Sequence, residues 1–550
     1  MNRYTLLFSA IVFMTGIGVT RAVSAPTRPG TKVVPAVVSS APAKDPVRAA
    51  RMDALRAARR AATLRLDRSL ADVISTRWRK DKWSVLVVSL EDGDTLFAHN
   101  PHAALEPASN LKLFTTSAAF HYLGPDYRFV TYLAAVGTIH DGVLDGDLVI
   151  YGTGDPTLSH RFYDSRTAVW DALADSLRHH GVREIRGDVV GDASYFGDPG
   201  FGPGWRERDV GYAFAAPASA LSFNDNVVTM HITPARKVGD PPELHLYPGA
   251  DGLAIQNRAV TVARGRVRLA VSRASYDGPI VVRGSIGQNR TGEWRSVPVE
   301  DPAHYAAAVL TESLRQAGIA VHGVARSIGP GEASPITGRH TFAPSFQDAK
   351  PVQVLVTQRS PRLQKILEII NRRSDNLYAE MVLRAVGRIV MHDGTAHGGA
   401  RAVEAMLAGS DSAQHTLDMV DGSGLSGLNR TSAATIIGLL QMMAASPNWD
   451  NFRATLPEAG NRHGLRRMYR TKAQGNLRAK TGTLRDVSAL SGYVRAEDGE
   501  LLAFSIISNH VPSTWRAKRI EDRIGARLAA FARPTLPDTD ALDITDDVAQ

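Results

Sequence analysis

The feature of this sequence that most limits its fold is a long run of strand patterns between two helical regions. From about residue 127 to 300, segments such as VLDGDLVIYG, NVVTMHI, VRLAVS and PIVVRG alternate with Asp-Gly and Pro-Gly turns. Apolar residues at helical spacing precede this run and return at 361–392 and 431–445. We therefore expect an α/β (α+β) domain that is split in the chain by β-rich inserted domains.

The length of 550 residues exceeds that of most single domains, so two or three domains are expected. The hydrophobic fraction of 44% and the charged fraction of 22% are those of an ordinary soluble globular protein. The predicted division is a signal peptide at 1–25, a linker at 26–60, the first part of the split domain at 61–130, β-rich inserted domains at 131–349, its second part at 350–532, and an acidic disordered tail at 533–550.

The N-terminal residues have the layout of a secretory signal peptide. A short region with Arg3 is followed by an apolar stretch from Leu6 to Val19, and small residues precede Pro26. A retained N-terminal anchor is the alternative. Residues 48–76 contain seven arginines among leucines, which predicts a basic helix with a solvated face or with a peripheral contact to the envelope. We expect an exported protein of the periplasm or cell envelope.

Cysteine is absent, which excludes disulfides, thiolate metal sites and a cysteine nucleophile. The histidines do not form an H-E-x-x-H pattern, so we expect neither a metal nor a cofactor. The formal net charge of +9 favours anionic envelope polymers or lipids as partners and does not indicate nucleic acid. The remaining catalytic options are oxygen nucleophiles and carboxylates.

Ser109 and Lys112 form a candidate nucleophile and base. A strand pair is predicted over 83–100, and the spacing of LKLFTTSAAFHYLG predicts that Ser109 opens a helix ended by Gly124. Three residues of helix place both side chains on one face, about 4.5 Å apart along the axis. A serine hydroxyl needs such an adjacent base. The pattern alone is weak evidence, because S-x-x-K arises by chance about twice in a chain of this length.

Lys112 can act as a base only when its amine is neutral, so its pKa must lie well below the usual 10.4 or so. Lys480 is a candidate cause. A like charge about 6 Å away, at an effective dielectric constant near 20, costs about 2.8 kcal/mol, or about 2 pKa units. We expect burial and the positive helix N-terminus to supply the rest.

Ser374-Asp375-Asn376 is the second candidate motif. It lies at the junction of the helical patterns LQKILEIINRR and LYAEMVLRAVGRIV, where a short loop could present a hydroxyl and an amide to a cleft. Two other Ser-x-Asn matches begin at Ser222 and Ser446, and they are interpreted as a segment of the β-rich insertion and a turn.

Lys480-Thr481-Gly482 is the third candidate motif and the rarest, expected by chance in about one chain in eight. Gly482 lies among residues that are common in β-strands, and a glycine in a strand often marks close approach by a ligand. With Thr483 beyond it, this edge would bind a carboxylate.

The order S-x-x-K, S-D-N, K-T-G resembles class A β-lactamases and penicillin-binding proteins. The separation of 265 positions from Ser109 to Ser374 does not fit a compact β-lactamase. The sequence is similar to the low-molecular-mass class C penicillin-binding proteins, the D-alanyl-D-alanine carboxypeptidase/endopeptidase family. The similarity covers roughly residues 80–530 and includes PASNLKLFTTSAA, YGTGDPTL, FAAPASALSFNDN, DGSGLS, LPEAGNRHGLRR and AKTGTL.

The resemblance implies a transpeptidase-like core and attack by Ser109 on the bond between two D-alanines or in a peptide cross-link. Lys112 would accept the serine proton, and the backbone N-H groups of Ser109 and Thr483 would form the oxyanion hole. Ser374 and Asn376 would relay a proton to the leaving amine and position the substrate. Water would release the acyl-enzyme.

The resemblance also implies that Lys480 and Thr481 hold the terminal carboxylate. The partners expected from it are peptidoglycan stem peptides, with β-lactam antibiotics as inhibitors that acylate Ser109.

One departure concerns the far end of the cleft. Family members often have Arg directly after DGSGLS, whereas this sequence has Gly427, with Arg430 three residues on. In the family this Arg lies near the cleft where the diamino acid of the stem peptide binds, and the resemblance implies that the acidic partner of that pocket is Asp209, in WRERDVGYAFAAP. Alternatives are a β-lactamase-like hydrolase, faintly supported by Glu458, and a non-catalytic cell-wall binding protein.

Overall fold

The computed structural model describes residues 46–74, 82–249, 253–276, 278–336, 351–409 and 416–536. The chain divides after Ala54 into two compact units. Of the first unit, residues 46–54 are described, and they begin helix α1 (Pro46–Ile74). The second unit holds all the other described elements. In the described ranges, no helix combines the length and the apolar character needed to cross a membrane.

A five-stranded antiparallel sheet is built from both ends of the second unit, in the order β18-β19-β20-β1-β2. Its strands are β1 (Lys82–Ser89), β2 (Thr95–His99), β18 (Arg478–Thr483), β19 (Ser488–Arg495) and β20 (Leu501–Asn509). β1 pairs with β20 along its whole length. The predicted strand pair over 83–100 and the predicted strand at LLAFSIISNH are confirmed.

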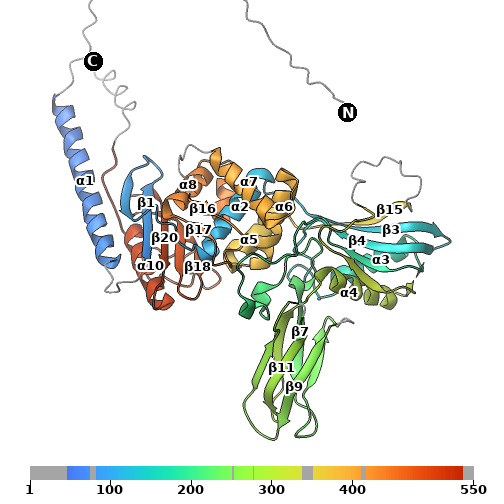
Figure 1. Cartoon of the computed structure of the whole chain (residues 1–550). Coiled ribbons are helices and arrows are strands. Elements are labelled where there is room, and N and C mark those ends of the chain that lie inside the picture. The colour runs from blue at the N-terminus through green and yellow to red at the C-terminus, as the bar shows by residue number, and fades with distance from the viewer. Residues whose placement is uncertain are drawn as a thin grey trace, which may run out of the picture. The chain divides into compact units, whose positions relative to one another are not determined.

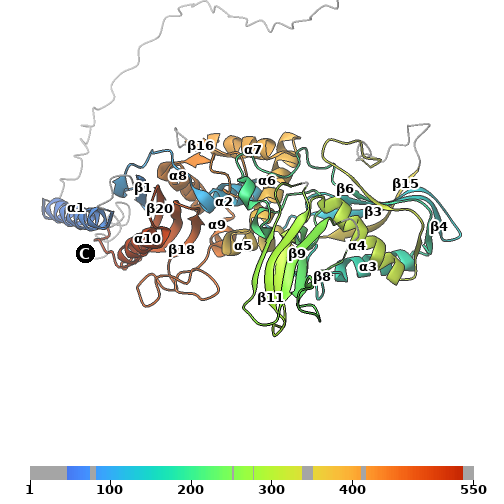
Figure 2. The ribbon, with the colours of Figure 1, turned by 60° about the horizontal axis from the view of Figure 1, so that its bottom comes forward.

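Both faces of this sheet are buried, because successive side chains of each strand enter different cores. On β20, Ala503 and Ile507 belong to the core of the helix cluster, whereas Phe504 and Ile506 pack with Leu70 of α1 and with α10 (Thr514–Ala529). Figure 2 shows α10 beside the sheet. This double burial explains why β20 has a continuous apolar run instead of alternation.

A cluster of helices covers the other face of the sheet (Figure 1). It contains α2 (Lys112–Tyr122), α5 (Leu363–Arg373), α6 (Asn376–Met391), α7 (Ala396–Ala408), α8 (Ala433–Ala444) and α9 (Trp449–Thr455). α2 contacts each of the other five helices, and its residues from Lys112 to Phe120 are all buried. The helix that follows Ser109 is therefore held from every side. The predicted mixed fold class is confirmed.

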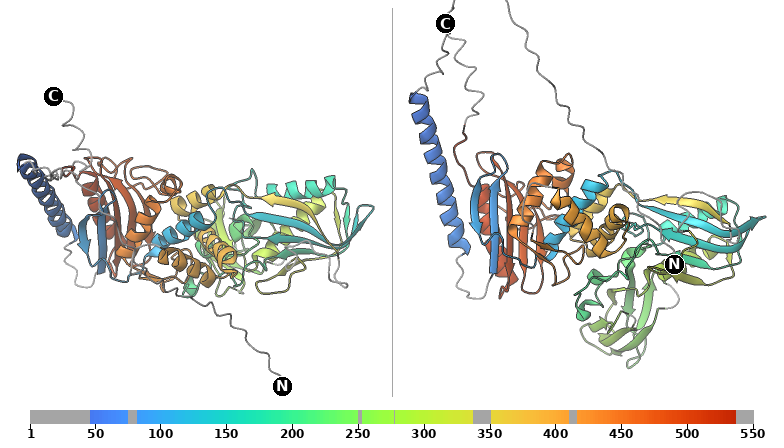
Figure 3. Two further views of the ribbon diagram at one scale, coloured as in Figure 1. Left: turned by 90° about the horizontal axis from the view of Figure 1, so that it is seen from above. Right: turned by 45° about the horizontal axis from the view of Figure 1, so that its top comes forward.

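The inserted region has two parts, which Figure 3 shows as separate groups of strands. The first is a mixed sheet with two helices: β3 (Val130–His140), β4 (Val143–Gly152), α3 (Ala168–His179), β5 (Glu184–Ile185), β6 (Val189–Asp192), α4 (Pro302–Gln316), β13 (Ala320–Val321), β14 (Ala325–Ile328) and β15 (Val352–Arg359). The second has two three-stranded sheets: β7 (Val227–Thr233), β8 (Glu243–Tyr247), β9 (Ile255–Val262), β10 (Arg268–Ser272), β11 (Ile280–Gly287) and β12 (Glu293–Pro298).

The predicted boundary of the insertion at 349 is one strand too early. β15 pairs with β3, from Val352 opposite Val136 to Arg359 opposite Val130, so it belongs to the inserted sheet. The pairing of β15 with β3 could not be predicted from the sequence, because more than 200 residues separate the two strands.

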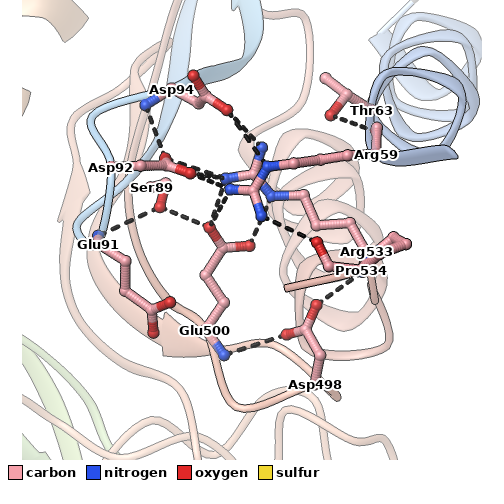
Figure 4. A network of polar contacts seen from close by, with 10 residues as sticks. All are labelled: Arg59, Thr63, Ser89, Glu91, Asp92, Asp94, Asp498, Glu500, Arg533 and Pro534. Atoms are coloured by element: carbon pink, nitrogen blue, oxygen red, sulfur yellow. Dashed lines mark hydrogen bonds and ion pairs between the residues drawn. The ribbon is translucent and has the colours of Figure 1, made fainter. Parts of the chain in front are cut away.

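Two terminal boundaries also need correction. α1 begins at Pro46, whereas the linker was predicted to reach residue 60; proline suits the first turn of a helix, and the Ala, Arg and Leu residues that follow are strong helix formers. Arg533, predicted to begin the disordered tail, instead packs against the second unit, because its side chain is only 1% exposed and pairs with Asp92, Asp94 and Glu500 (Figure 4). The predicted signal peptide and residues 537–550 lie outside the described residues.

Candidate active site

Ser109 lies on a tight turn at the N-terminal end of α2. The turn is the 3-10 helix η1 (Ala108–Leu111), and Ala108 has a φ of 48°, in the left-handed region that a residue with a Cβ adopts only under strain. Ser109 is half-buried and lines a cavity of about 400 Å³, and Lys112 is the first residue of α2. The predicted helical start is confirmed.

The Lys112 amine has three oxygen neighbours. Its Nζ lies 3.1 Å from Ser109 Oγ, 2.6 Å from Asn376 Oδ1 and 2.6 Å from the carbonyl oxygen of Ser423. The Asn376 amide is oriented by its Nδ2, which donates to the Phe214 carbonyl at 2.8 Å. A neutral amine has two hydrogens and one lone pair, so two acceptors leave the lone pair for the Ser109 hydroxyl.

Burial lowers the pKa of Lys112 to about 8, although Asp421 and Glu380 act in the opposite direction. Burial also brings the pKa of Lys480 well below its usual range, and the charge of Lys112 adds to this. The sequence predicted that repulsion between the two lysines lowers the pKa of Lys112. The repulsion is present, but the pKa that it lowers is that of Lys480. For Lys112, burial is the main cause.

The loop 374–376 joins helices α5 and α6 as predicted. Ser374 ends α5 with a φ of 57°, and the Asp375 side chain caps α6 by accepting from the Tyr378 N-H. Asp375 also pairs with Arg161 at 3.1 Å, and Arg161 pairs with Asp225 at 2.9 Å. Arg161 and Asp225 come from the inserted region; Asp225 lies in the segment FAAPASALSFNDN, which contributes to the family resemblance, but the ion pairs were not predicted.

Strand β18 brings the third motif to the same place. Lys480 Nζ donates to Ser374 Oγ and to the Thr481 carbonyl, both at 2.9 Å. Gly482 lies against the serine turn, because a Cβ at this position would be 2.7 Å from the carbonyl oxygen of Pro107. Thr483 lines the cavity with Ser109. The strand context predicted for this motif is confirmed.

The loop 421–426, which is the DGSGLS motif, contributes a part of the site that was not predicted. Gly424 has a φ of 76°, and a Cβ there would lie 1.9 Å from the carbonyl oxygen of Ala108. Glu380 accepts from the N-H groups of Gly422 and Ser423 at 3.0 and 2.8 Å, which places the Ser423 carbonyl beside Lys112. Glu380 follows Asn376 by four residues on α6, so helical spacing was the signal that could have found it.

The mouth of the cavity carries charge of both signs. Asp209, predicted to bind the substrate, lines this cavity together with Arg206, Arg208 and Arg485, which were not predicted. Gly427 is not among the residues that line this cavity. In the described part of the chain, no group of three or more His, Asp or Glu side chains is placed to hold a metal ion.

Two serine–lysine hydrogen bonds facing one cavity, on a helix cluster packed against an antiparallel sheet, define a serine enzyme with the β-lactamase and transpeptidase-like fold. The chain belongs to the D-Ala-D-Ala carboxypeptidase 3 (S13) family, whose model matches residues 65–531. The family predicted from the motifs is therefore confirmed.

Curated relatives agree with this assignment, and a solved structure agrees with the fold. The chain is 34% identical over 467 residues to a D-alanyl-D-alanine carboxypeptidase of Actinomadura sp., with 82% of each chain covered. It is 27% identical over 420 residues to D-alanyl-D-alanine carboxypeptidase DacB of Haemophilus influenzae, covering 74% of this chain and 81% of that one. The crystal structure of penicillin binding protein 4 from H. influenzae matches with a TM-score of 0.69 at 24% identity, over 84% of this chain and 98% of the other.

Proposed function

We propose that this protein hydrolyses the D-alanyl-D-alanine end, or a D-alanine cross-link, of peptidoglycan stem peptides through an acyl-enzyme on Ser109. The observation that carries this proposal is the placement of Lys112 and Lys480, each hydrogen-bonded to a serine that lines one cavity. Family membership and the carboxypeptidase relatives support it. The Haemophilus protein has also been solved in complex with a β-lactam, which supports β-lactams as inhibitors here.

Acylation begins with neutral Lys112 as the base. Its two N-H bonds are directed at Asn376 and the Ser423 carbonyl, so its lone pair receives the proton as Ser109 Oγ attacks the substrate carbonyl. The backbone N-H groups of Ser109 and Thr483 stabilise the negative oxygen that develops. Asn376 also lines the cavity, where it positions the peptide.

Lys480 and Thr481 bind the carboxylate of the terminal residue. The arriving negative charge raises the pKa of the Lys480 amine, so substrate binding restores its positive charge. Lys480 then holds Ser374 through their 2.9 Å hydrogen bond. The Ser374 hydroxyl relays the proton that Lys112 took from Ser109: it gives its own proton to the leaving amine and regains one from Lys112, which becomes neutral again. Water finally hydrolyses the ester on Ser109.

The same proposal places the protein outside the cytoplasm, in the periplasm or cell envelope, because its substrate is found there. The exposed arginines of α1 in the second unit, among them Arg56, Arg60 and Arg68, would serve a peripheral contact with the anionic envelope. Asp209 would bind a cationic group of the stem peptide at the mouth of the cavity.

Intact-mass analysis after incubation with benzylpenicillin tests the nucleophile. The wild type gains one drug mass, and Ser109→Ala gains none. An adduct that persists in Ser109→Ala contradicts the assignment. Rapid turnover of the drug by the wild type would instead indicate the β-lactamase-like alternative, although Glu458 is engaged in an ion pair with Arg478.

Digestion of purified cross-linked peptidoglycan tests the reaction itself. Release of D-alanine from monomeric pentapeptides indicates carboxypeptidase action, and conversion of dimers to monomers indicates endopeptidase action. If wild-type protein that is acylated normally by benzylpenicillin forms neither product, the result would favour the alternative of a non-catalytic cell-wall binding protein.

A further inference from the structure

The sheet β12-β7-β8 has one apolar face and one aromatic face. Met230 and Ile232 of β7, with Leu244 and Leu246 of β8, point into the core of the inserted region. Because side chains alternate along a strand, the positions between them point the other way. These outward positions carry Thr229, His231, Thr233, Glu243, His245, Tyr247, Trp294 and Ser296.

The outward aromatic residues lie in register across the three strands. Trp294 on β12 is opposite His231 on β7, which is opposite His245 on β8. The Trp294 and His231 rings stack with centroids 4.1 Å apart and an angle of 8° between their planes. Tyr247 reaches Trp294 diagonally, at 5.6 Å between ring centroids. The four rings form one continuous surface, which we name the aromatic platform.

The aromatic platform is open to solvent. Trp294 is 56% exposed and Tyr247 is 43% exposed, although large aromatic residues are usually more buried than this. Cross-strand stacking would stabilise the hairpin even with the rings covered, so it does not account for their exposure. Exposed apolar surface of this kind marks a binding surface.

The charge on this face limits what it can bind. Glu243 is the one formally charged residue among the outward positions, and it lies 3.6 Å from His245. Without Lys or Arg at these positions, the face offers no charge complement to an anionic lipid or polymer. Hydroxyl groups lie beside the rings instead: that of exposed Ser296 is 3.1 Å from that of buried Thr229.

We propose that the aromatic platform binds a glycan strand, with sugar rings stacked on Trp294 and Tyr247. A pyranose presents C-H groups on its flat faces and hydroxyl groups at its edge, which matches aromatic faces bordered by hydrogen-bonding groups. The platform is also connected to the candidate active site, since β12 contacts the segment η3 (Ala213–Ala215), and Phe214 of that segment lines the cavity. The choice of a peptidoglycan glycan as ligand rests on the proposed function.

The experiment measures co-sedimentation of the full-length protein with chitin, an insoluble and uncharged polymer of β-1,4-linked N-acetylglucosamine, which serves as the probe for a peptidoglycan-type glycan. All proteins carry Ser109→Ala, so that catalysis does not contribute. Trp294→Ala is expected to weaken binding about tenfold, equivalent to about 1.4 kcal/mol. Trp515→Ala is the matched control, because Trp515 on α10 is 62% exposed and lies outside the platform, and it is expected to bind normally.

Three outcomes would overturn the proposal: unchanged binding by Trp294→Ala, an equal loss in Trp515→Ala, or a wild-type dimer that Trp294→Ala dissociates without affecting glycan binding. The last outcome would identify the platform as an interface between two copies of the chain. Acylation of Trp294→Ala by benzylpenicillin, with Ser109 restored, checks folding. Because that reaction does not involve the platform, failure of glycan binding and failure of the proposed catalytic function are distinguishable.

Discussion

At the scale of single residues, the site depends on the amine of Lys112 being uncharged. Lys112 is fully buried, which disfavours the ammonium form, yet the carboxylates of Asp421 and Glu380 lie near enough to favour it. Burial is the larger effect, and the pKa settles at about 8. The sequence indicated the base and its serine, whereas the balance between burial and carboxylates depends on residues more than 250 positions away.

The pKa of Lys112 predicts the pH dependence of acylation. The base is active when neutral, so the rate constant for acylation of Ser109 by benzylpenicillin should rise with pH and level off above about 8. At about pH 6 it should be roughly a hundredfold below the plateau, since about two pKa units separate these conditions. Stopped-flow measurement across this range checks it, and a flat profile, or a midpoint near that of free lysine, would contradict it.

At the scale of elements, the serine turn is enclosed by two glycines on different segments. Gly424 of the loop 421–426 and Gly482 of β18 each approach a backbone carbonyl of the turn more closely than a side chain permits. The strained φ of Ala108 is held between these two contacts. Neither glycine touches a reacting atom in this arrangement, but both determine where Ser109 points.

Gly424→Ala should therefore slow acylation strongly. Its Cβ would meet the Ala108 carbonyl at 1.9 Å, and a displacement of about 1 Å at a catalytic group costs about a hundredfold in rate. Gly475→Ala is the control, because Gly475 has a similar φ of 71° but no atom within 4 Å of the position that a Cβ would take. Both variants pay the left-handed backbone cost of about 1–2 kcal/mol. Equal acylation rates in the two variants, measured by intact mass, would refute this role.

The three motifs and their elements were predictable because each depends on local patterns. Ser109 opens a helix, Ser374 joins two helices and Lys480 lies on a strand, and all three features follow from spacing and helix ends. Arg161 and β15 were not predictable in their roles, because an ion pair or a strand pairing over such sequence separations leaves no mark on either segment. Asp209 was placed through family resemblance alone.

At the scale of the whole second unit, helix α1 and the segment around Arg533 hold the sheet on which the site is built. Arg59 of α1 pairs with Asp92 and donates to the Pro534 carbonyl, while Arg533 pairs with Glu500 (Figure 4). The network fixes the turn between β1 and β2 from both sides. Since β2 is the last strand before the serine turn, terminal segments far from the chemistry support the position of Ser109.

Removing the central arginine of this network should destabilise the sheet. Arg533→Ala leaves Glu500 buried without its main partner, because the side chains are 1% and 5% exposed, and the loss of one member of a buried pair costs about 3–5 kcal/mol. In Lys472→Ala the broken pair with Glu497 is about half exposed on both sides, so the cost should stay below about 1 kcal/mol. Urea unfolding followed by tryptophan fluorescence, to which buried Trp83 of β1 contributes, measures both. Similar shifts of the two midpoints would show that the network adds no more than a surface pair, whereas the burial of Arg533 and Glu500 requires a clear difference.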